Sequence, residues 1–511
     1  MNVRTLLVFV ALFAACGEEA TEADVGIQWF DGTVDEAFAH AKATGKPVYL
    51  YWGAVWCPPC HAIQATVFRS PEFIERSRLF VPVYLDGDKE NAQAAGERFG
   101  VFGYPTMIVF DADGRELTRI PGGIDLQAYA NILDVTLGHA SSATDIVQRV
   151  MTGGATLSPA ECQQLAWYSW EQDVTILEPY DPVTAFRRMR SACPEDADVE
   201  RSLLFFNALD ARLNALENDI DADALSVDEI GQAVAMLDQV LGDYRLTRAN
   251  VVAMNFSGAR YVAALTESGS ERRRQLIRRF NDAYDALFAD ETLYKRERLY
   301  TLAGRIDFER IDDEEAALSD KLKQRIRDTA RWADESTPSV YERQPIINAM
   351  ANVLESAGMD DEGRELLLAE LEISEQPYYY MVGLADIEQR AGNHDRAIDW
   401  LKKAWDSSLG PATRFQWGYY YLTGLIEMRP EDADAIRNTT VALITELQSG
   451  GGFYQRPKAQ LARLESALEE WGGTHDARAT LESIRAEVVT VCARDPEPVS
   501  RATCESFLDA A

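Results

Sequence analysis

Two cysteines separated by two residues follow a run of apolar and aromatic residues, and this arrangement constrains the fold more than any other feature of the chain. The run covers Pro47 to Trp52 and is continuous, as is typical of a buried strand. The motif after it is Trp56-Cys57-Pro58-Pro59-Cys60-His61, and a helix is expected to begin at Cys57. Unpaired amides at a helix start favour a thiolate, and Cys60 lies one turn later, where it can attack a mixed disulfide formed by Cys57. The motif therefore predicts a dithiol–disulfide exchange site.

Strand and helix patterns alternate around this motif from residue 26 to residue 138. A capping box formed by Thr33 and Glu36 predicts one helix, and Ser70-Pro71 predicts the start of another. Because proline cannot donate to a ladder, Pro82 is expected to mark the beginning of regular pairing in its strand. The expected strands are residues 27–30, 47–52, 80–85, 105–110 and 116–120. The predicted fold of this part is an α/β domain.

A second motif, Gly103-Tyr104-Pro105-Thr106, opens a strand that ends in an Asp-x-Asp-Gly turn. Together with the order of elements and the Trp-Cys-Pro-Pro-Cys motif, it resembles the thioredoxin-fold family, most closely its exported thioredoxin-like group. The resemblance covers residues 26–138 and implies a βαβαββα core. It implies that Cys57 is the attacking thiolate, that Cys60 resolves the mixed disulfide, and that Pro105 is a cis proline beside them. Substrate binding and support of the site are expected from Trp56, Pro58, Pro59, Tyr104 and Pro105.

Two features of the motif bear on its chemistry. Tyr51 stands where thioredoxins commonly bury an Asp near the resolving cysteine, so that acid is absent or supplied from elsewhere. Pro58 and Pro59 lack N–H groups, so only amides such as that of Cys60 remain to stabilise the Cys57 thiolate. We therefore expect a reducing rather than a strongly oxidising pair, the alternative being that the two prolines only stiffen the turn.

The same motif is also compatible with haem binding, because C-x-x-C-H is the attachment pattern of c-type haem. The buried strand before the motif and the Tyr104-Pro105 element favour the redox pair instead. His61 is then expected to be an exposed helix residue that could place a cation near the cysteines. The other histidines are isolated in sequence, so we expect no metal and no organic cofactor.

The chain starts with a segment typical of a leader. Arg4 supplies a positive start, and residues 6–15 form an apolar run too short to span a bilayer. The run ends in Phe13-Ala14-Ala15-Cys16-Gly17, which resembles a bacterial lipoprotein cleavage site. The resemblance implies a signal peptide at 1–15, a lipid on Cys16 that anchors the chain to a membrane, and a tether at 16–25. Ordinary secretory cleavage with Cys16 unmodified is the alternative, and in both cases the chain leaves the cytoplasm. The expected location is the bacterial cell envelope, facing the periplasm.

The cysteine count agrees with export, because disulfides persist in oxidising compartments. There are seven cysteines, and Cys16 and the pair at 57 and 60 leave four. Four cysteines allow three pairings, of which we expect the one between nearest neighbours, with free buried thiols as the alternative. The expected structural disulfides are Cys162–Cys193 and Cys492–Cys504.

Strand patterns disappear after a small, polar linker expected at 139–150, and residues 151–511 predict an all-α domain. Small residues and leucines recur at a spacing of 34, the tetratricopeptide period, as in Gly358 and Gly392. We expect tetratricopeptide-like repeats near 344–435, with a degenerate unit around Trp417. Stacked repeats offer a concave face to a protein partner, the alternative being a scaffold without a ligand. Two aromatic clusters, at 167–170 and 378–380, are expected to be core rather than groove.

Length and charge limit the number of domains and the class of partner that the chain can have. A chain of 511 residues exceeds one compact core, so two or more domains are expected. A net charge of −33 opposes binding of nucleic acid. We therefore expect an exported thiol–disulfide oxidoreductase that reduces or exchanges disulfides of envelope proteins, is reset by an unidentified redox partner, and touches the membrane through its lipid only. The alternative is a helical-repeat binding or scaffold protein whose α/β domain is mainly structural.

Overall fold

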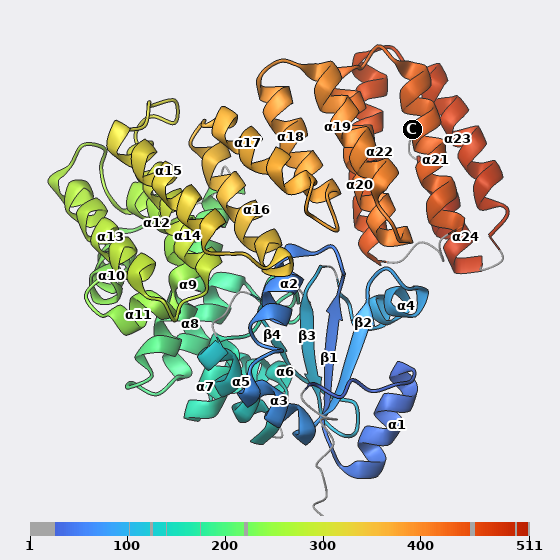
Figure 1. Ribbon diagram of the computed structural model, residues 1–511. Helices are drawn as coiled ribbons and strands as arrows, with labels where there is room; N and C mark the ends of the chain where they lie inside the picture. The colour runs from blue at the N-terminus through green and yellow to red at the C-terminus, as the bar shows by residue number, and fades with distance from the viewer. Residues whose placement is uncertain are drawn as a thin grey trace, which may run out of the picture.

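The computed structural model describes residues 26–101, 103–122, 126–138, 141–173, 175–218, 223–449, 455–495 and 498–508. The expected leader, Cys16 and the tether lie outside the described residues. The described chain consists of an α/β domain followed by a long all-helical region, which is the order of fold classes that the patterns predicted (Figure 1).

A four-stranded sheet forms the centre of the α/β domain. Its strands are β1 (Val48–Gly53), β2 (Val81–Asp86), β3 (Thr106–Phe110) and β4 (Glu116–Ile120). The strand order is β2-β1-β3-β4. β1 pairs in parallel with β2, whereas β3 is antiparallel to both β1 and β4. With the helices between them, these strands form the expected βαβαββα core.

The strand expected at 27–30 is not formed, and that prediction is wrong. A backbone hydrogen bond joins this segment to the sheet, from the N–H of Phe30 to the carbonyl of Pro82 at 2.8 Å. β2 is an edge strand, and Pro82 has no N–H to offer to a further neighbour, so no ladder can continue there. Pairing of β2 begins at Val81, opposite Val48, one residue before the expected start.

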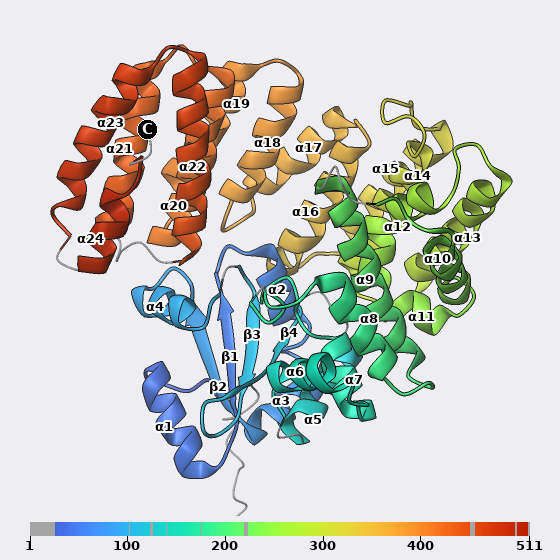
Figure 2. The same ribbon diagram turned by 180° about the vertical axis from the view of Figure 1, so that it is seen from behind.

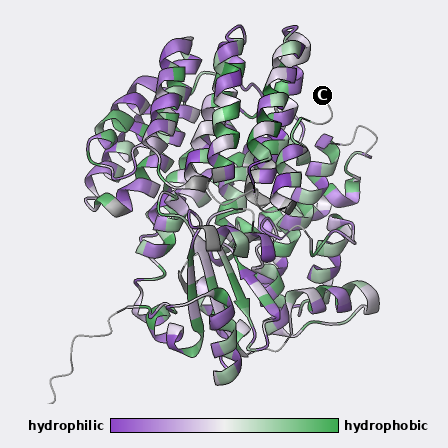
Figure 3. Ribbon diagram, turned by 90° about the vertical axis from the view of Figure 1, so that its right-hand side faces the viewer, coloured by the Kyte–Doolittle hydropathy of each residue, from purple (hydrophilic) through white to green (hydrophobic). Residues whose placement is uncertain are grey.

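Helices cover both faces of the sheet, because alternate residues of β1 point to opposite sides. Val48, Leu50 and Trp52 lie in one apolar cluster with alanines of α1 (Val34–Thr44) and α4 (Glu90–Arg98). Tyr49 and Tyr51 lie in a second cluster, with α2 (Pro58–Ala65), α3 (Pro71–Arg76) and α5 (Leu126–Gly138). Figure 3 shows that the strands are mostly apolar, as expected for a sheet buried on both faces.

The helical region begins with ten helices that lead away from the sheet. They are α6 (Ala143–Gly153), α7 (Pro159–Ala166), α8 (Pro182–Ala192), α9 (Asp198–Asn218), α10 (Val227–Val240), α11 (Tyr244–Ala249), α12 (Val251–Leu265), α13 (Glu271–Ala289), α14 (Lys295–Glu309) and α15 (Asp320–Glu335). Residues 143–150, which we expected to belong to the linker, form the first part of α6 because Ser142 caps a helix there. Ile146, Val147 and Val150 bury its apolar face.

The remaining helices return to the α/β domain. They are α16 (Val340–Ser356), α17 (Asp360–Leu371), α18 (Tyr378–Arg390), α19 (His394–Ser407), α20 (Pro411–Met428), α21 (Ala433–Ser449), α22 (Gln455–Thr474), α23 (Arg478–Cys492) and α24 (Pro498–Glu505). In Figures 1 and 2 they lie over the end of the sheet that carries α2 and α4. α16 packs directly on α2.

The repetition seen in the sequence appears as two similar helical hairpins, α16–α17 and α18–α19. Gly358 and Gly392 follow the first helix of each hairpin with φ of 67° and 73°, a left-handed backbone that favours glycine. The turn bonds are also equivalent, from Met359 N–H to the Leu354 carbonyl and from Asn393 N–H to the Glu388 carbonyl. Among the described residues, none of the helices combines the length and apolar character that crossing a bilayer requires.

Candidate active site

Cys57 is the N-cap of α2, where the sequence placed it. Its backbone is extended, with φ −84° and ψ 113°, and Pro58 and Pro59 occupy the first helical positions. The Cys57 sulfur accepts a hydrogen bond from the Cys60 N–H at 3.2 Å, and the two cysteines form a disulfide with their Cα atoms 5.2 Å apart. A sulfur at this place faces the amide that the two prolines leave available, and a second sulfur lies within bonding distance. The geometry suits a reversible dithiol–disulfide pair.

The loop before β3 lies beside the cysteine motif. The peptide bond between Tyr104 and Pro105 is cis, as the resemblance implied. The Tyr104 ring packs on Trp52 and Trp56, with ring centroids 4.4 and 5.5 Å apart. A Cβ at Gly87 would lie 2.1 Å from the Tyr104 hydroxyl, so only glycine fits beside this ring. The motif and the proline loop are therefore brought together by aromatic packing.

His61 differs from its expectation. It was expected to be exposed, but only 6% of it is accessible. Its Nε2 atom lies 2.5 Å from the Val55 carbonyl, which can only accept, so Nε2 carries a proton. Burial lowers the pKa of His61 below its ordinary value. The ring is therefore neutral near pH 7, and it does not place a cation beside the cysteines.

Tyr51 occupies the position at which an acid was considered. It is 1% exposed, stacks on Tyr84 with centroids 5.4 Å apart, and accepts a hydrogen bond from Gln64 Nε2 at 3.3 Å. The position is therefore part of an aromatic core and carries no carboxylate.

The redox motif is covered by the helical region, a feature that the sequence did not indicate. Cys57 is 3% exposed and Cys60 is 0% exposed. Gln344 of α16 donates from Nε2 to the Trp56 carbonyl at 2.9 Å, and Trp417 of α20 packs edge-on against Trp56 with centroids 6.0 Å apart. No local pattern marks such contacts, because 288 residues separate Gln344 from Trp56.

Asp88, just after β2, accepts hydrogen bonds from the α/β domain and from the helical region. Trp56 Nε1 donates to Asp88 Oδ2 at 3.1 Å. Thr413, at the start of α20, donates its N–H and its hydroxyl to Asp88 Oδ1 at 2.8 and 2.6 Å. Burial raises the pKa of Asp88 above its ordinary value, although the Thr413 donors oppose this shift. The carboxylate thus joins the cysteine motif to α20.

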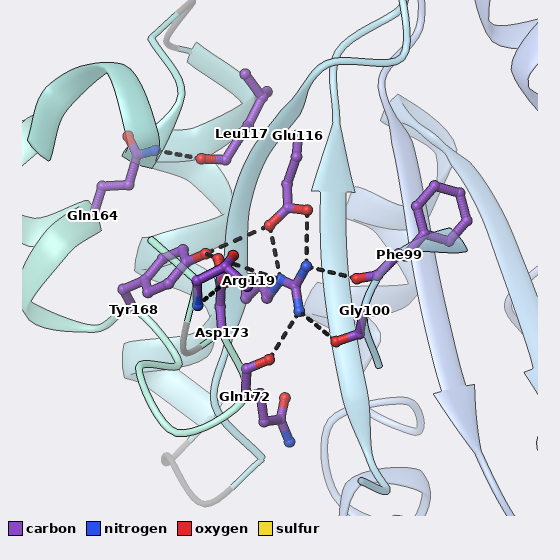
Figure 4. A network of polar contacts seen from close by, with 10 residues as sticks. Phe99, Gly100, Glu116, Leu117, Arg119, Gln164, Tyr168, Gln172 and Asp173 are labelled. Atoms are coloured by element: carbon purple, nitrogen blue, oxygen red, sulfur yellow. Dashed lines mark hydrogen bonds and ion pairs between the residues drawn. The ribbon is translucent and has the colours of Figure 1, made fainter. Parts of the chain in front are cut away.

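A buried arginine of β4 connects the end of α4 to the loop after α7 (Figure 4). Arg119 of β4 is 5% exposed and donates to Glu116 at 2.8 Å, to the Phe99 carbonyl at 2.7 Å and to the Gln172 carbonyl at 2.9 Å. The Gln172 side chain, in the loop after α7, then donates to the Pro105 carbonyl at 2.7 Å. Sequence reasoning missed this network, because an arginine in a strand gives no signal of its buried partners.

The other four cysteines lie away from the redox pair. Cys162 of α7 bonds to Cys193 at the end of α8, and Cys492 of α23 bonds to Cys504 of α24, with Cα–Cα distances of 5.4 and 5.5 Å. This is the nearest-neighbour pairing. The aromatic residues Tyr168, Tyr378 and Tyr380 are buried, as expected for core packing.

Comparisons with known proteins point to the same part of the chain. Residues 34–136 match a family described as a thioredoxin-like domain. The chain is 30% identical over 115 residues to the disulfide bond reductase DsbH of Chlamydia pneumoniae, covering 20% of this chain and 68% of that protein. It is 39% identical over 106 residues to the thiol:disulfide interchange protein DsbD of Cronobacter sakazakii, covering 20% of this chain.

These similarities are partial. The match spans 18% of the length of that DsbD protein. A solved structure named DsbH oxidoreductase is similar over 25% of this chain and 96% of that chain, with 23% identity and a TM-score of 0.21. Through its residues 34–136, the chain belongs to the thioredoxin-like family.

Proposed function

We propose that the protein is an exported thiol–disulfide oxidoreductase that reduces or exchanges disulfides in proteins of the cell envelope. The observation that carries the proposal is the Cys57–Cys60 pair at the start of α2, packed through Trp56 against the cis Tyr104–Pro105 bond. Its relatives are named for disulfide reduction and for thiol:disulfide interchange, which supports the same chemistry.

In the reducing direction, the Cys57 thiolate attacks one sulfur of a client disulfide. The disulfide breaks, and the other client sulfur leaves as a thiolate that takes a proton from solvent. The Cys60 thiolate then attacks the Cys57 sulfur, so the mixed disulfide breaks and the first client sulfur leaves in the same way. Two electrons have passed from the Cys57–Cys60 dithiol to the client, and the pair is now a disulfide. A dithiol on an unidentified redox partner must reduce it again.

The surroundings of Cys57 favour a reducing pair. Its sulfur accepts from the Cys60 N–H, while Pro58 and Pro59 supply no donors and His61 is neutral. A weakly stabilised thiolate makes the dithiol a better electron donor. We expect a reduction potential well below the strongly oxidising value of about −120 mV, measured by equilibration with glutathione.

Insulin reduction by the full-length chain tests the proposed activity. Wild type should turn over, Cys57→Ser should be inactive, and Cys60→Ser should accumulate a mixed disulfide with its client. The trapped adducts, identified by mass spectrometry, would name the clients. Equal rates for wild type and Cys57→Ser would contradict the proposal.

The burial of the motif favours a second candidate, a helical-repeat binding protein in which the α/β domain is structural. Cys57 is 3% exposed beneath α16 and α20. This candidate predicts that Cys57→Ser and Cys60→Ser leave partner binding on the helical region unchanged, while no mixed disulfide forms in cells.

Export and anchoring are a separate part of the proposal. We infer that residues 1–15 direct export and that Cys16 carries a lipid, which holds the protein on the periplasmic side of a membrane. The expected result for Cys16→Ser is loss of the protein from the membrane fraction, with the mass of the N-terminal peptide reporting the lipid. Retention of Cys16→Ser in the membrane would contradict a lipid anchor.

A further inference from the structure

The redox pair is enclosed, although disulfide exchange requires a client sulfur to touch it. The attacking sulfur must meet the client disulfide directly, yet Trp56, Cys57 and Cys60 are 6%, 3% and 0% exposed. If the proposed function holds, something must uncover Cys57 before a folded or extended protein segment can react there. The covering elements are α16 and α20.

α16 and α20 contact the peptide that leads into Cys57. Gln344, which is 4% exposed, donates to the Trp56 carbonyl. Trp417 packs on the Trp56 ring from α20, and the same apolar cluster holds Cys57, Cys60 and several residues of α20. The two helices therefore lie on the cysteine motif itself and not merely near it. We call α16 and α20 together the cover.

The cover is fastened at Asp88. Thr413 is 0% exposed and gives two hydrogen bonds to the Asp88 carboxylate, which also accepts from Trp56. Losing these donors would leave a half-buried carboxylate without the hydrogen bonds that offset its burial, which is unfavourable. The start of α20 approaches so closely that a Cβ on Gly410 would lie 2.6 Å from Asp88 Cγ, and Gly410 has a φ of 83°.

The rest of the contact between the two parts is mainly apolar, because α16 packs on α2 and one buried apolar cluster runs from the sheet face into α20. The ion pair Lys458–Glu97 spans 3.3 Å and joins side chains that are 36% and 44% exposed, so it contributes little. On the opposite side, the buried Arg119 network holds the loop after α7 to the α/β domain. Movement of the cover therefore has to expose part of this apolar cluster, while the Arg119 network keeps the start of the helical region attached.

We propose that α16 and α20 form a cover over the Cys57–Cys60 pair, latched through Thr413 and Asp88, and that a protein client reaches Cys57 only after this cover moves away. The cover makes disulfide exchange conditional on an event that loosens the latch, such as binding of a client to the helical region. The inference rests on the proposed function for its biological meaning, but the burial of Cys57 can be tested without it.

Two variants loosen the latch without touching the cysteine motif. Gly410→Ala adds left-handed strain and a clash with Asp88, and Thr413→Val removes the hydroxyl donor while keeping the shape of the side chain. Each has a matched control. Gly392→Ala carries the same kind of strain at φ 73° with nothing within 4 Å of the added Cβ, and Thr423→Val removes a hydroxyl that bonds only within α20.

The measurement is the rate at which Cys57 of the reduced, full-length chain reacts with iodoacetamide and with a maleimide that carries a polyethylene glycol chain, followed by peptide mapping. Both latch variants should react with the bulky reagent about tenfold faster than wild type, which corresponds to a shift of about 1.4 kcal/mol in the opening equilibrium. The two controls should match wild type. The labelling rate with the bulky maleimide, divided by the rate with iodoacetamide, should rise only in the latch variants.

Equal labelling rates in the latch variants, the controls and wild type would contradict the proposed cover. So would a Cys57 that reacts with the bulky reagent as fast in folded wild type as in the urea-unfolded chain. The insulin assay separates the two proposals. If the latch variants accelerate labelling but no variant reduces insulin, the cover stands and the proposed activity fails. If they reduce insulin at the wild-type rate despite unchanged labelling, the activity stands and the cover fails.

Discussion

Removal of the Arg119 side chain should destabilise the protein strongly. Its side chain is 7% exposed, and its guanidinium bonds to Glu116 and to the carbonyls of Phe99, Gly100 and Gln172. Each hydrogen bond to a charged group contributes about 1.5–3 kcal/mol, but the released carbonyls are partly rehydrated and Glu116 is 30% exposed. We therefore expect Arg119→Met to lower the free energy of unfolding by about 3–5 kcal/mol, as for breaking a buried pair.

Urea unfolding followed by tryptophan fluorescence and by circular dichroism measures this loss. The matched control is Arg115→Met, only four residues away, since Arg115 is 50% exposed in its ion pairs with Asp111 and Asp145. That change should cost less than about 1 kcal/mol. Similar costs for the two variants would refute the reasoning that Arg119 is a buried link between β4, the proline loop and the helical region.

Three further predictions concern pH and the structural disulfides. The pKa of His61 is lowered in the folded chain, so the unfolded chain binds more protons as pH falls below the ordinary pKa of 6.5, and the free energy of unfolding should decline there. In His61→Gln, the urea concentration at the unfolding midpoint should depend less on pH. An unchanged dependence would contradict the burial argument. Burial raises the pKa of Asp386 from 3.8 to about 6, so the folded chain binds more protons than the unfolded chain between these two pH values, and stability should fall as pH rises through this range. Asp386→Asn should remove that fall. The same dependence of the unfolding midpoint on pH in wild type and variant would contradict the prediction. Replacing both Cys162 and Cys193 by Ala should lower the free energy of unfolding by about 3.7 kcal/mol through loop entropy, and removing the Cys492–Cys504 disulfide, which closes a shorter loop, should lower it by about 2.8 kcal/mol. A larger loss of thermal stability for the shorter loop would contradict this loop-length effect.

Local chemistry made the α/β domain predictable. The apolar run at 47–52 could only be buried as a strand between two helical layers, and the capping boxes and Ser-Pro starts marked helices because their side chains satisfy amides within the same turn. The strand expected at 27–30 failed for a non-local reason, since its partner would have been an edge strand that contains Pro82. The prediction for His61 was wrong because α16, which is distant in sequence, packs on the helix that carries His61.

The amino-acid sequence by itself determined the redox pair and the order of helices and strands around it, because a cysteine at a helix start, a proline at the next position and a continuous apolar run act through neighbours along the chain. Only the tertiary structure decided that the pair is enclosed. Gln344, Thr413 and Trp417 lie hundreds of residues from Trp56 and Asp88, and contacts across such separations arise from the packing of whole helices. Helix packing is specified by summed apolar surfaces rather than by any motif that a short stretch of sequence displays.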